Sequence, residues 1–243
     1  GLVFSLMKKL GLIVNPIAGM GGRVGLKGTD GSDTFQRARE LGAKPESPHK
    51  ARVFLKGVFG KLGTKIHLYV ASGAMGEEEA RATGLEPVVV GGISGNLTTA
   101  QSTKMAAAAM EEIGVDLLVF VGGDGTASDI YDAVGDRLVV LGVPAGVKMY
   151  SGVYANSPIS ASTLVARYLG GESIEVQDQE IIDVDEKAVQ MDRLCLKLYA
   201  YLRVPFHRNL VQGSKDAATG DVKVLEDIAA DFVETMHAQC VIS

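Results

Sequence analysis

Short, continuous apolar runs recur along the first 143 residues of the chain, separated by stretches of helical composition. Runs without alternation are typical of strands buried on both faces of a parallel sheet. They predict strands at residues 10–15, 65–70, 87–91, 117–121 and 138–143. The helical stretches lie at residues 32–41, 47–59, 76–82, 99–113 and 128–134. Alternating strands and helices predict an α/β fold with a doubly wound, mostly parallel sheet.

The pattern changes after about residue 174. Residues 173–185 and 194–204 alternate in part between apolar and polar positions, which predicts two long antiparallel strands. A polar loop then leads to a predicted helix at residues 221–237. We therefore expect an N-terminal α/β domain over residues 1–171 and the start of a β-rich C-terminal domain over residues 172–243. The final four residues resemble the opening of another strand, so we expect this second domain to be incomplete.

Composition and charge narrow the class of protein. Hydrophobic residues make up 47% of the chain, which suits a packed core and argues against disorder. No apolar run approaches the roughly 18 residues that span a bilayer. The net charge is −5 and the basic residues are scattered, so neither a membrane nor a nucleic acid is an expected partner. The two cysteines and four histidines lack zinc-site spacing. We expect a cytoplasmic globular protein that binds small molecules.

Glycine is over-represented, at 30 of 243 residues against an average of about 7%, and four glycine-rich loops follow predicted strands. The strongest signal is the string Gly-Gly-Asp-Gly-Thr at residues 122–126. Its glycines let a ligand approach the backbone, and Thr126 with Asp129 predicts a capping box at the start of the next helix. Backbone N–H groups at a helix start bind phosphate. Asp124 is placed there to bind Mg²⁺ or to accept a hydroxyl proton; the alternative is a tight turn with a surface aspartate.

The second loop, residues 15–31, follows the first predicted strand. It is not a dinucleotide fingerprint, because Val24 stands in place of the third glycine, and it contains no Gly-Lys-Ser/Thr of a Walker A loop. Arg23 and Lys27 still suit a polyphosphate cradle, with an ordinary surface loop as the alternative. The candidate cofactor-binding residues of this loop are Asn15, Gly19, Gly21, Gly22, Lys27, Thr29 and Asp30.

Two further loops also follow predicted strands. The loop at residues 91–99 enters an alanine-rich helix, and plain N-capping is the alternative to a ligand-binding role there. In the loop at residues 142–152, Lys148 either neutralises a phosphate or is an ordinary solvated lysine. The candidate cofactor-binding residues of these two loops are Gly92, Asn96, Thr98, Thr99, Gly146, Lys148 and Ser151.

A pair of carboxylates ends the first of the two antiparallel strands. Asp183 and Asp185 lie two residues apart, so they point to the same face of a strand and could share a cation. The candidate Mg²⁺ ligands are therefore Asp124, Asp183 and Asp185, and a solvated turn is the alternative for the last two.

These motifs together resemble the ATP-NAD kinase superfamily, which also includes the diacylglycerol and sphingosine kinases. The resemblance rests on Asn15-Pro16 after the first strand, on the Gly-Gly-Asp-Gly-Thr string, and on the Pro-Ala-Gly segment at residues 144–146. Residues 26–31, 95–99 and 146–151 are similar to the NAD-kinase-like branch grouped with the acetoin-catabolism protein AcoX. The Thr-Gly-Asn-Asp-Phe-Ala pattern of the lipid kinases is missing, which weakens that branch.

The resemblance implies a two-domain kinase with a cleft for a nucleotide and for NAD. Such an enzyme transfers a phosphoryl group from ATP or polyphosphate, with Mg²⁺, to the 2′-hydroxyl of NAD and gives NADP. Asp124 would take the catalytic role, and Gly122, Gly123, Gly125 and Thr126 would shape the phosphate and ribose pocket. The Asn-Glu motif of the family has no clean match, although Asp183 and Asp185 lie in a comparable region. The family also implies a homo-oligomer.

Two other interpretations stay open. A kinase of the same fold could act on the hydroxyl of a lipid or small metabolite. A protein of a different class, a non-catalytic nucleotide sensor, would bind NAD and ATP without turnover.

Overall fold

The computed structural model describes residues 7–19, 40–42, 44–91, 100–146, 149–184 and 196–212. Within them five parallel strands form one sheet in the order β3-β2-β1-β4-β5. The strands are β1 (Lys8–Val14), β2 (Ile66–Ala71), β3 (Val88–Val90), β4 (Leu117–Gly122) and β5 (Val140–Pro144). The predicted α/β fold with a mostly parallel sheet is confirmed. Every residue of β4 and of β5 is buried, as the unbroken apolar runs indicated.

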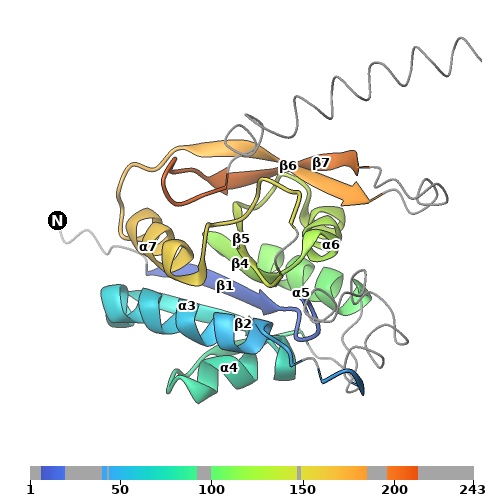
Figure 1. Cartoon of the computed structure of the whole chain (residues 1–243). Coiled ribbons are helices and arrows are strands. Elements are labelled where there is room, and N and C mark those ends of the chain that lie inside the picture. Colours follow the sequence, from blue (N-terminus) through green and yellow to red (C-terminus); the bar gives the residue numbers. More distant parts are fainter. Residues whose placement is uncertain are drawn as a thin grey trace, which may run out of the picture.

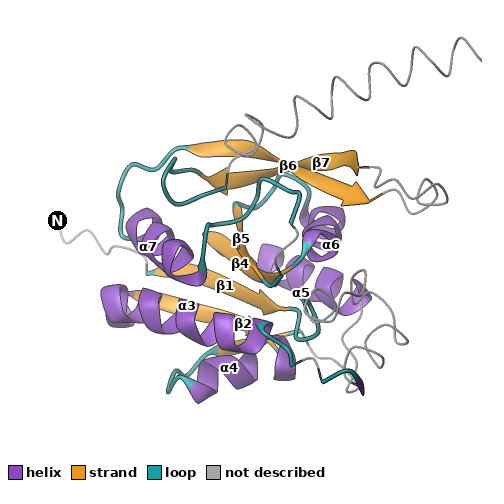
Figure 2. Ribbon diagram, viewed as in Figure 1, coloured by secondary structure: helices purple, strands orange, loops and turns teal. Residues whose placement is uncertain are grey.

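Helices cover both faces of this sheet (Figures 1 and 2). On one face α3 packs against α7 and α4, and on the other α5 packs against α6. The helices are α3 (Ser47–Leu62), α4 (Glu77–Ala82), α5 (Ala100–Ile113), α6 (Asp124–Val134) and α7 (Pro158–Leu169), with short 3₁₀ turns η1 (Gly63–Lys65) and η2 (Gly73–Met75). No helix of the described residues has both the length and the apolar character needed to cross a membrane.

Helix α7 was not among the predicted helices, although its start carries a clear signal. The Ser157 hydroxyl accepts a hydrogen bond from the backbone N–H of Ser160 at 3.0 Å. Pro158 follows at the first helical position, where a missing N–H costs nothing. The predicted helices at residues 32–41, apart from its last two positions, and at 221–237 lie outside the described residues.

Two antiparallel strands, β6 (Val176–Val184) and β7 (Leu196–Pro205), form a separate two-stranded sheet. They confirm the two predicted antiparallel strands, and a register shift between Ile181 and Ile182 interrupts their pairing. Both strands pack against α6, and β7 also contacts β5 (Figure 1). The domain boundary at residue 171 stays a prediction.

Tyr199 connects β7 to α6 through an aspartate. Its hydroxyl donates to Asp132 Oδ1 at 2.6 Å, and Lys104 Nζ donates to Asp132 Oδ2, also at 2.6 Å. The Tyr199 ring also meets the Tyr131 ring edge to face, at 6.3 Å between centroids. The hydrogen bonds from Lys104 and Tyr199 lower the pKa of the Asp132 carboxyl, and Asp132 raises the pKa of Tyr199 to about 12.

This lowered pKa predicts a pH-dependent contribution to stability. A carboxyl whose pKa is lower in the folded chain stabilises it at pH values above its unfolded pKa of about 4. That contribution disappears as the pH falls through the lowered folded pKa. Asp132→Asn is therefore expected to lower Tm by roughly 1–3 °C at pH 7, and by less at pH 3. Thermal unfolding of both chains at the two pH values measures this, and an equal difference at both would contradict it.

Candidate active site

Three loops meet at the carboxyl ends of β1, β4 and β5. The strand order reverses between β1 and β4, which is where open α/β sheets bind ligands. The backbone N–H of Asn15 donates to the carbonyl of Val121 at 2.8 Å, and that of Ala145 donates to the carbonyl of Gly122 at 3.0 Å. These bonds hold the loops after β1 and β5 against the end of β4.

The Gly-Gly-Asp-Gly-Thr string forms the junction between β4 and α6. Gly122 ends β4 and has no room for a side chain, because a Cβ there would lie 2.5 Å from Thr126 Oγ1. Gly123 is extended and is the N-cap of α6, which begins at Asp124. A negative charge in this first turn is favourable because the N-terminus of a helix carries partial positive charge.

The capping box predicted for Thr126 is wrong. Helix α6 begins at Asp124, so Thr126 is its third residue, and no side chain caps the helix. The Thr126 hydroxyl instead accepts a hydrogen bond from Asn15 Nδ2 at 3.1 Å, which joins the loop after β1 to α6. Within the described part of the chain, the first backbone N–H groups of α6 have no side-chain acceptor. They are therefore available for a ligand anion.

Three donors hold the Asp124 carboxylate, and all come from the loop that follows β5. The backbone N–H of Tyr150 donates to Oδ2 at 2.8 Å. The backbone N–H of Ser151 donates to Oδ1 at 3.2 Å, and the Tyr154 hydroxyl donates to Oδ1 at 3.1 Å. The carboxylate is thus anchored although its residue is only partly buried. Ser151 was a candidate from sequence; Tyr150 and Tyr154 were missed because they follow Asp124 by 26 and 30 positions.

Tyr154 is fully buried, and its ring is fixed by the sheet beneath it. The ring meets Phe120 edge to face at 5.7 Å between centroids. It lies over Gly142, where a Cβ would come within 2.5 Å of Tyr154 Cδ1. Burial and the Asp124 carboxylate raise the pKa of the Tyr154 phenol well above its usual range. The phenol therefore stays protonated and serves as a donor to Asp124.

The strand β6 reaches the same loop. The Ser151 hydroxyl accepts from the backbone N–H of Ile182 at 2.9 Å, and the backbone N–H of Gly152 donates to the Glu180 carbonyl at 2.9 Å. Asp183 is the exposed residue that follows Ile182. The antiparallel sheet and the loop that holds Asp124 are therefore bonded directly to each other.

The loop after β1 approaches the loop after β5 very closely. Gly19 has φ +81°, and a Cβ there would lie 2.2 Å from the carbonyl oxygen of Ala145. The Gly19 Cα is 3.5 Å from the position of a Cβ built on Gly146. Both glycines were candidates from sequence, and the structure brings them together.

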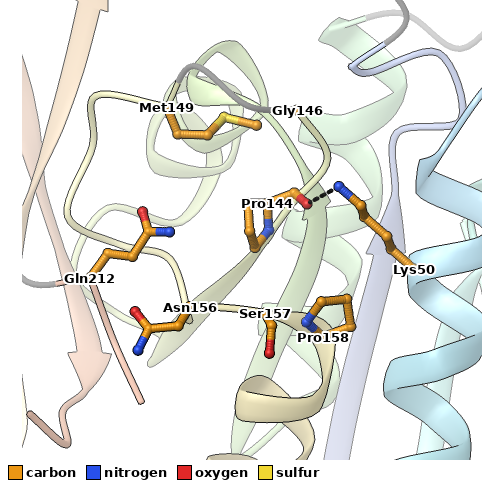
Figure 3. A pocket seen from close by; sticks show the side chains of 8 residues that line it. All are labelled: Lys50, Pro144, Gly146, Met149, Asn156, Ser157, Pro158 and Gln212. Atoms are coloured by element: carbon orange, nitrogen blue, oxygen red, sulfur yellow. Dashed lines mark hydrogen bonds between the residues drawn. The ribbon is translucent and has the colours of Figure 1, made fainter. Parts of the chain in front are cut away.

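A pocket of about 320 Å³ opens beside these loops. Lys50 of α3 lies on one side of it and donates to the Pro144 carbonyl at 3.0 Å (Figure 3). It also donates to the Ala145 carbonyl at 3.2 Å. Met149 is shared with the junction, because a Cβ on Gly123 would lie 3.8 Å from its sulfur. The lining residues are Lys50, Pro144, Gly146, Met149, Asn156, Ser157, Pro158 and Gln212. Only Gly146 among them was a candidate, because the pocket is built from α3, from the segment that runs from β5 to the start of α7, and from Gln212, which are far apart in the sequence.

The geometry agrees with a comparison against protein families. The family described as the ATP-NAD kinase N-terminal domain matches residues 10–173. The chain belongs to the ATP-NAD kinase family. No curated protein matches it. The match begins within β1 and runs through α7. It therefore includes most of the parallel sheet, the junction between β4 and α6 with Asp124, and the loop with Tyr154 that holds the Asp124 carboxylate. Membership supports a kinase activity.

The structure describes some of the site residues that were predicted from the sequence. Asn15, Gly19, Gly122, Gly123, Asp124, Gly125, Thr126, Gly146 and Ser151 lie at the carboxyl ends of β1, β4 and β5 or in the loop that follows β5. The remaining candidates lie outside the described residues: Gly21, Gly22, Lys27, Thr29, Asp30, Gly92, Asn96, Thr98, Thr99, Lys148 and Asp185. Their roles stay predictions.

The described residues contain no group of three or more histidine, cysteine or carboxylate side chains that could hold a metal ion. Mg²⁺ does not require such a group, because it usually keeps several waters and binds one or two carboxylates together with substrate phosphates. Asp124 and Asp183 supply oxygen ligands of the right kind. The magnesium assignment stays a prediction.

Proposed function

We propose that this chain transfers a phosphoryl group from ATP or polyphosphate to the 2′-hydroxyl of NAD and so forms NADP. The observation that carries the proposal is the anchored Asp124 carboxylate. It stands at the end of β4, beside the uncapped N-terminus of α6, within the region that matches the ATP-NAD kinase domain. A carboxylate held in place can accept the proton of a substrate hydroxyl. Backbone N–H groups at an uncapped helix N-terminus can bind a phosphate.

The proposed reaction needs positioning more than covalent chemistry. The ribose 2′-oxygen forms a bond to the transferred phosphorus while the bond from that phosphorus to the leaving phosphate oxygen breaks. Asp124 accepts the hydroxyl proton and orients the attacking oxygen. Backbone N–H groups of the first turn of α6 bind phosphate oxygens and stabilise charge that spreads over them in the transition state. Bound Mg²⁺ would offset the negative charge of the transferring phosphoryl group.

Incubation of the full chain with NAD, Mg²⁺ and either ATP or polyphosphate is expected to produce NADP. An NADP-specific dehydrogenase would detect the product. Removal of Mg²⁺ with a chelator should lower the rate of NADP formation by at least about 100-fold. No NADP with either donor would contradict the proposal. Thermal stabilisation by NAD and ATP without product would favour the nucleotide sensor. ATP consumption with another hydroxyl compound, and none with NAD, would favour a kinase for that acceptor.

Assembly into a homo-oligomer and a cytoplasmic location stay predictions. Sedimentation of the full chain would test the first of these.

A further inference from the structure

The Asp124 carboxylate has few acceptor positions left. An ionised carboxylate offers about four lone-pair sites, two on each oxygen. Ser151 N–H and the Tyr154 hydroxyl occupy those of Oδ1, and Tyr150 N–H occupies one of those of Oδ2. Among the described residues no other donor reaches this carboxylate. Counted over the residues that the structure describes, one acceptor position remains, on Oδ2.

Tyr154 differs from the other two donors because the packing of its side chain determines its position. Tyr150 and Ser151 contribute backbone groups of a loop, whereas the Tyr154 phenol extends from a fully buried ring. Backbone bonds hold Tyr154 on both sides: Gly142 N–H donates to the Val153 carbonyl at 2.8 Å, and Ala155 N–H donates to the Gly142 carbonyl at 2.9 Å. Residues of β4 and β5 thus determine where the hydroxyl stands. A buried phenol also needs a hydrogen-bond partner, and Asp124 is that partner.

We propose that Tyr154 is a positioning residue, whose hydroxyl fixes the Asp124 carboxylate so that only Oδ2 receives the acceptor hydroxyl. The inference rests on the proposed kinase function. Without the phenol, Oδ1 regains an acceptor position and the carboxylate loses its rigid contact with the sheet. The acceptor hydroxyl can then bind at either oxygen, and fewer complexes have the geometry for transfer. Such misplacement lowers the rate of the chemical step more than it lowers nucleotide affinity.

The test is Tyr154→Phe in the full chain, which keeps the ring and its contact with Phe120 and removes only the hydroxyl. Tyr199→Phe is the matched control, because it also removes a phenol that donates to an aspartate, Asp132 of α6. Asp132 lies eight residues beyond Asp124, about 12 Å along the helix. We expect kcat for NADP formation to fall roughly ten- to a hundredfold in Tyr154→Phe. KM for ATP should stay within about twofold, and the control should keep its kcat.

A second measurement does not depend on catalysis. Tm is compared among the parent chain, Tyr154→Phe, Asp124→Ala and the double variant. If Tyr154 and Asp124 act through their mutual contact, the double variant loses less than the sum of the single losses. Additive losses, or a Tyr154→Phe kcat within twofold of the parent, would overturn the positioning role. A rise in KM for ATP with kcat unchanged would also overturn it. A parent chain that forms no NADP would refute the proposed function instead, and non-additive losses would then still support the contact.

Discussion

Asp124→Asn is expected to lower the kcat for NADP formation by at least about 100-fold, the usual scale of a lost general base. The substitution keeps the size of the side chain but removes its charge and the lone-pair site on Oδ2 that the acceptor hydroxyl needs. The amide oxygen can still accept from Ser151 N–H and the Tyr154 hydroxyl. The amide nitrogen would then face the backbone N–H of Tyr150, so two donors would meet where one hydrogen bond stood.

The same geometry predicts a small cost in stability. One lost hydrogen bond to a partly exposed carboxylate is worth about 1–2 kcal/mol, or roughly 2–8 °C in Tm for a chain of this size. Asp132→Asn is the matched control, because it makes the same change on the same helix and leaves Asp124 untouched. NADP formation and Tm are measured on the same preparations. Asp124 would lose the catalytic role if Asp124→Asn kept its rate of NADP formation, or if Asp132→Asn lowered that rate equally.

The sequence predicts the fold well wherever a local pattern determines the element. The centre of each strand of the parallel sheet is a continuous apolar run, and the observed bounds differ from the predicted ones by at most two residues. Helix α6 shows where that logic fails. The prediction took Thr126 as the cap and began the helix at residue 128. The helix instead begins at Asp124, and the Thr126 hydroxyl bonds to Asn15, a residue far away in the sequence.

The candidate site divides in the same way. Asp124 is predictable because its glycine neighbours lie beside it in the sequence and follow a buried strand. Tyr154 and Lys50 carry no local signal. Tyr154 reaches Asp124 because Gly142 leaves space for its ring. Lys50 reaches the Ala145 carbonyl from α3, which packs against α7, β1 and β4. Such residues are selected by packing between distant segments, which one sequence does not reveal.

Gly19→Ala is expected to destabilise the chain by about 2–5 kcal/mol, the combined scale of a left-handed residue and an overpacked contact. At φ +81° an L side chain is strained, and its Cβ would lie 2.2 Å from the Ala145 oxygen and 2.7 Å from its carbonyl carbon. These are backbone atoms and cannot turn away. Lys50 Nζ binds the same oxygen at 3.2 Å, and Ala145 N–H is bonded to Gly122.

Gly84→Ala separates the two causes, because Gly84 also has φ +81° but no atom lies within 4 Å of its Cβ position. It should cost about 1–2 kcal/mol, the conformational part alone. Urea unfolding of both variants measures the difference, and equal losses would show that the close approach of Gly19 to Ala145 is absent in solution. Gly19→Ala should also weaken stabilisation by ATP and NAD, since Ala145 leads into the loop that holds Asp124. Gly84→Ala should leave that stabilisation unchanged, because Gly84 lies between α4 and the start of β3, whereas the three loops follow the ends of their strands. If only Gly19→Ala loses stabilisation by nucleotides, the close approach of the loop after β1 to the loop after β5 is needed for substrate binding.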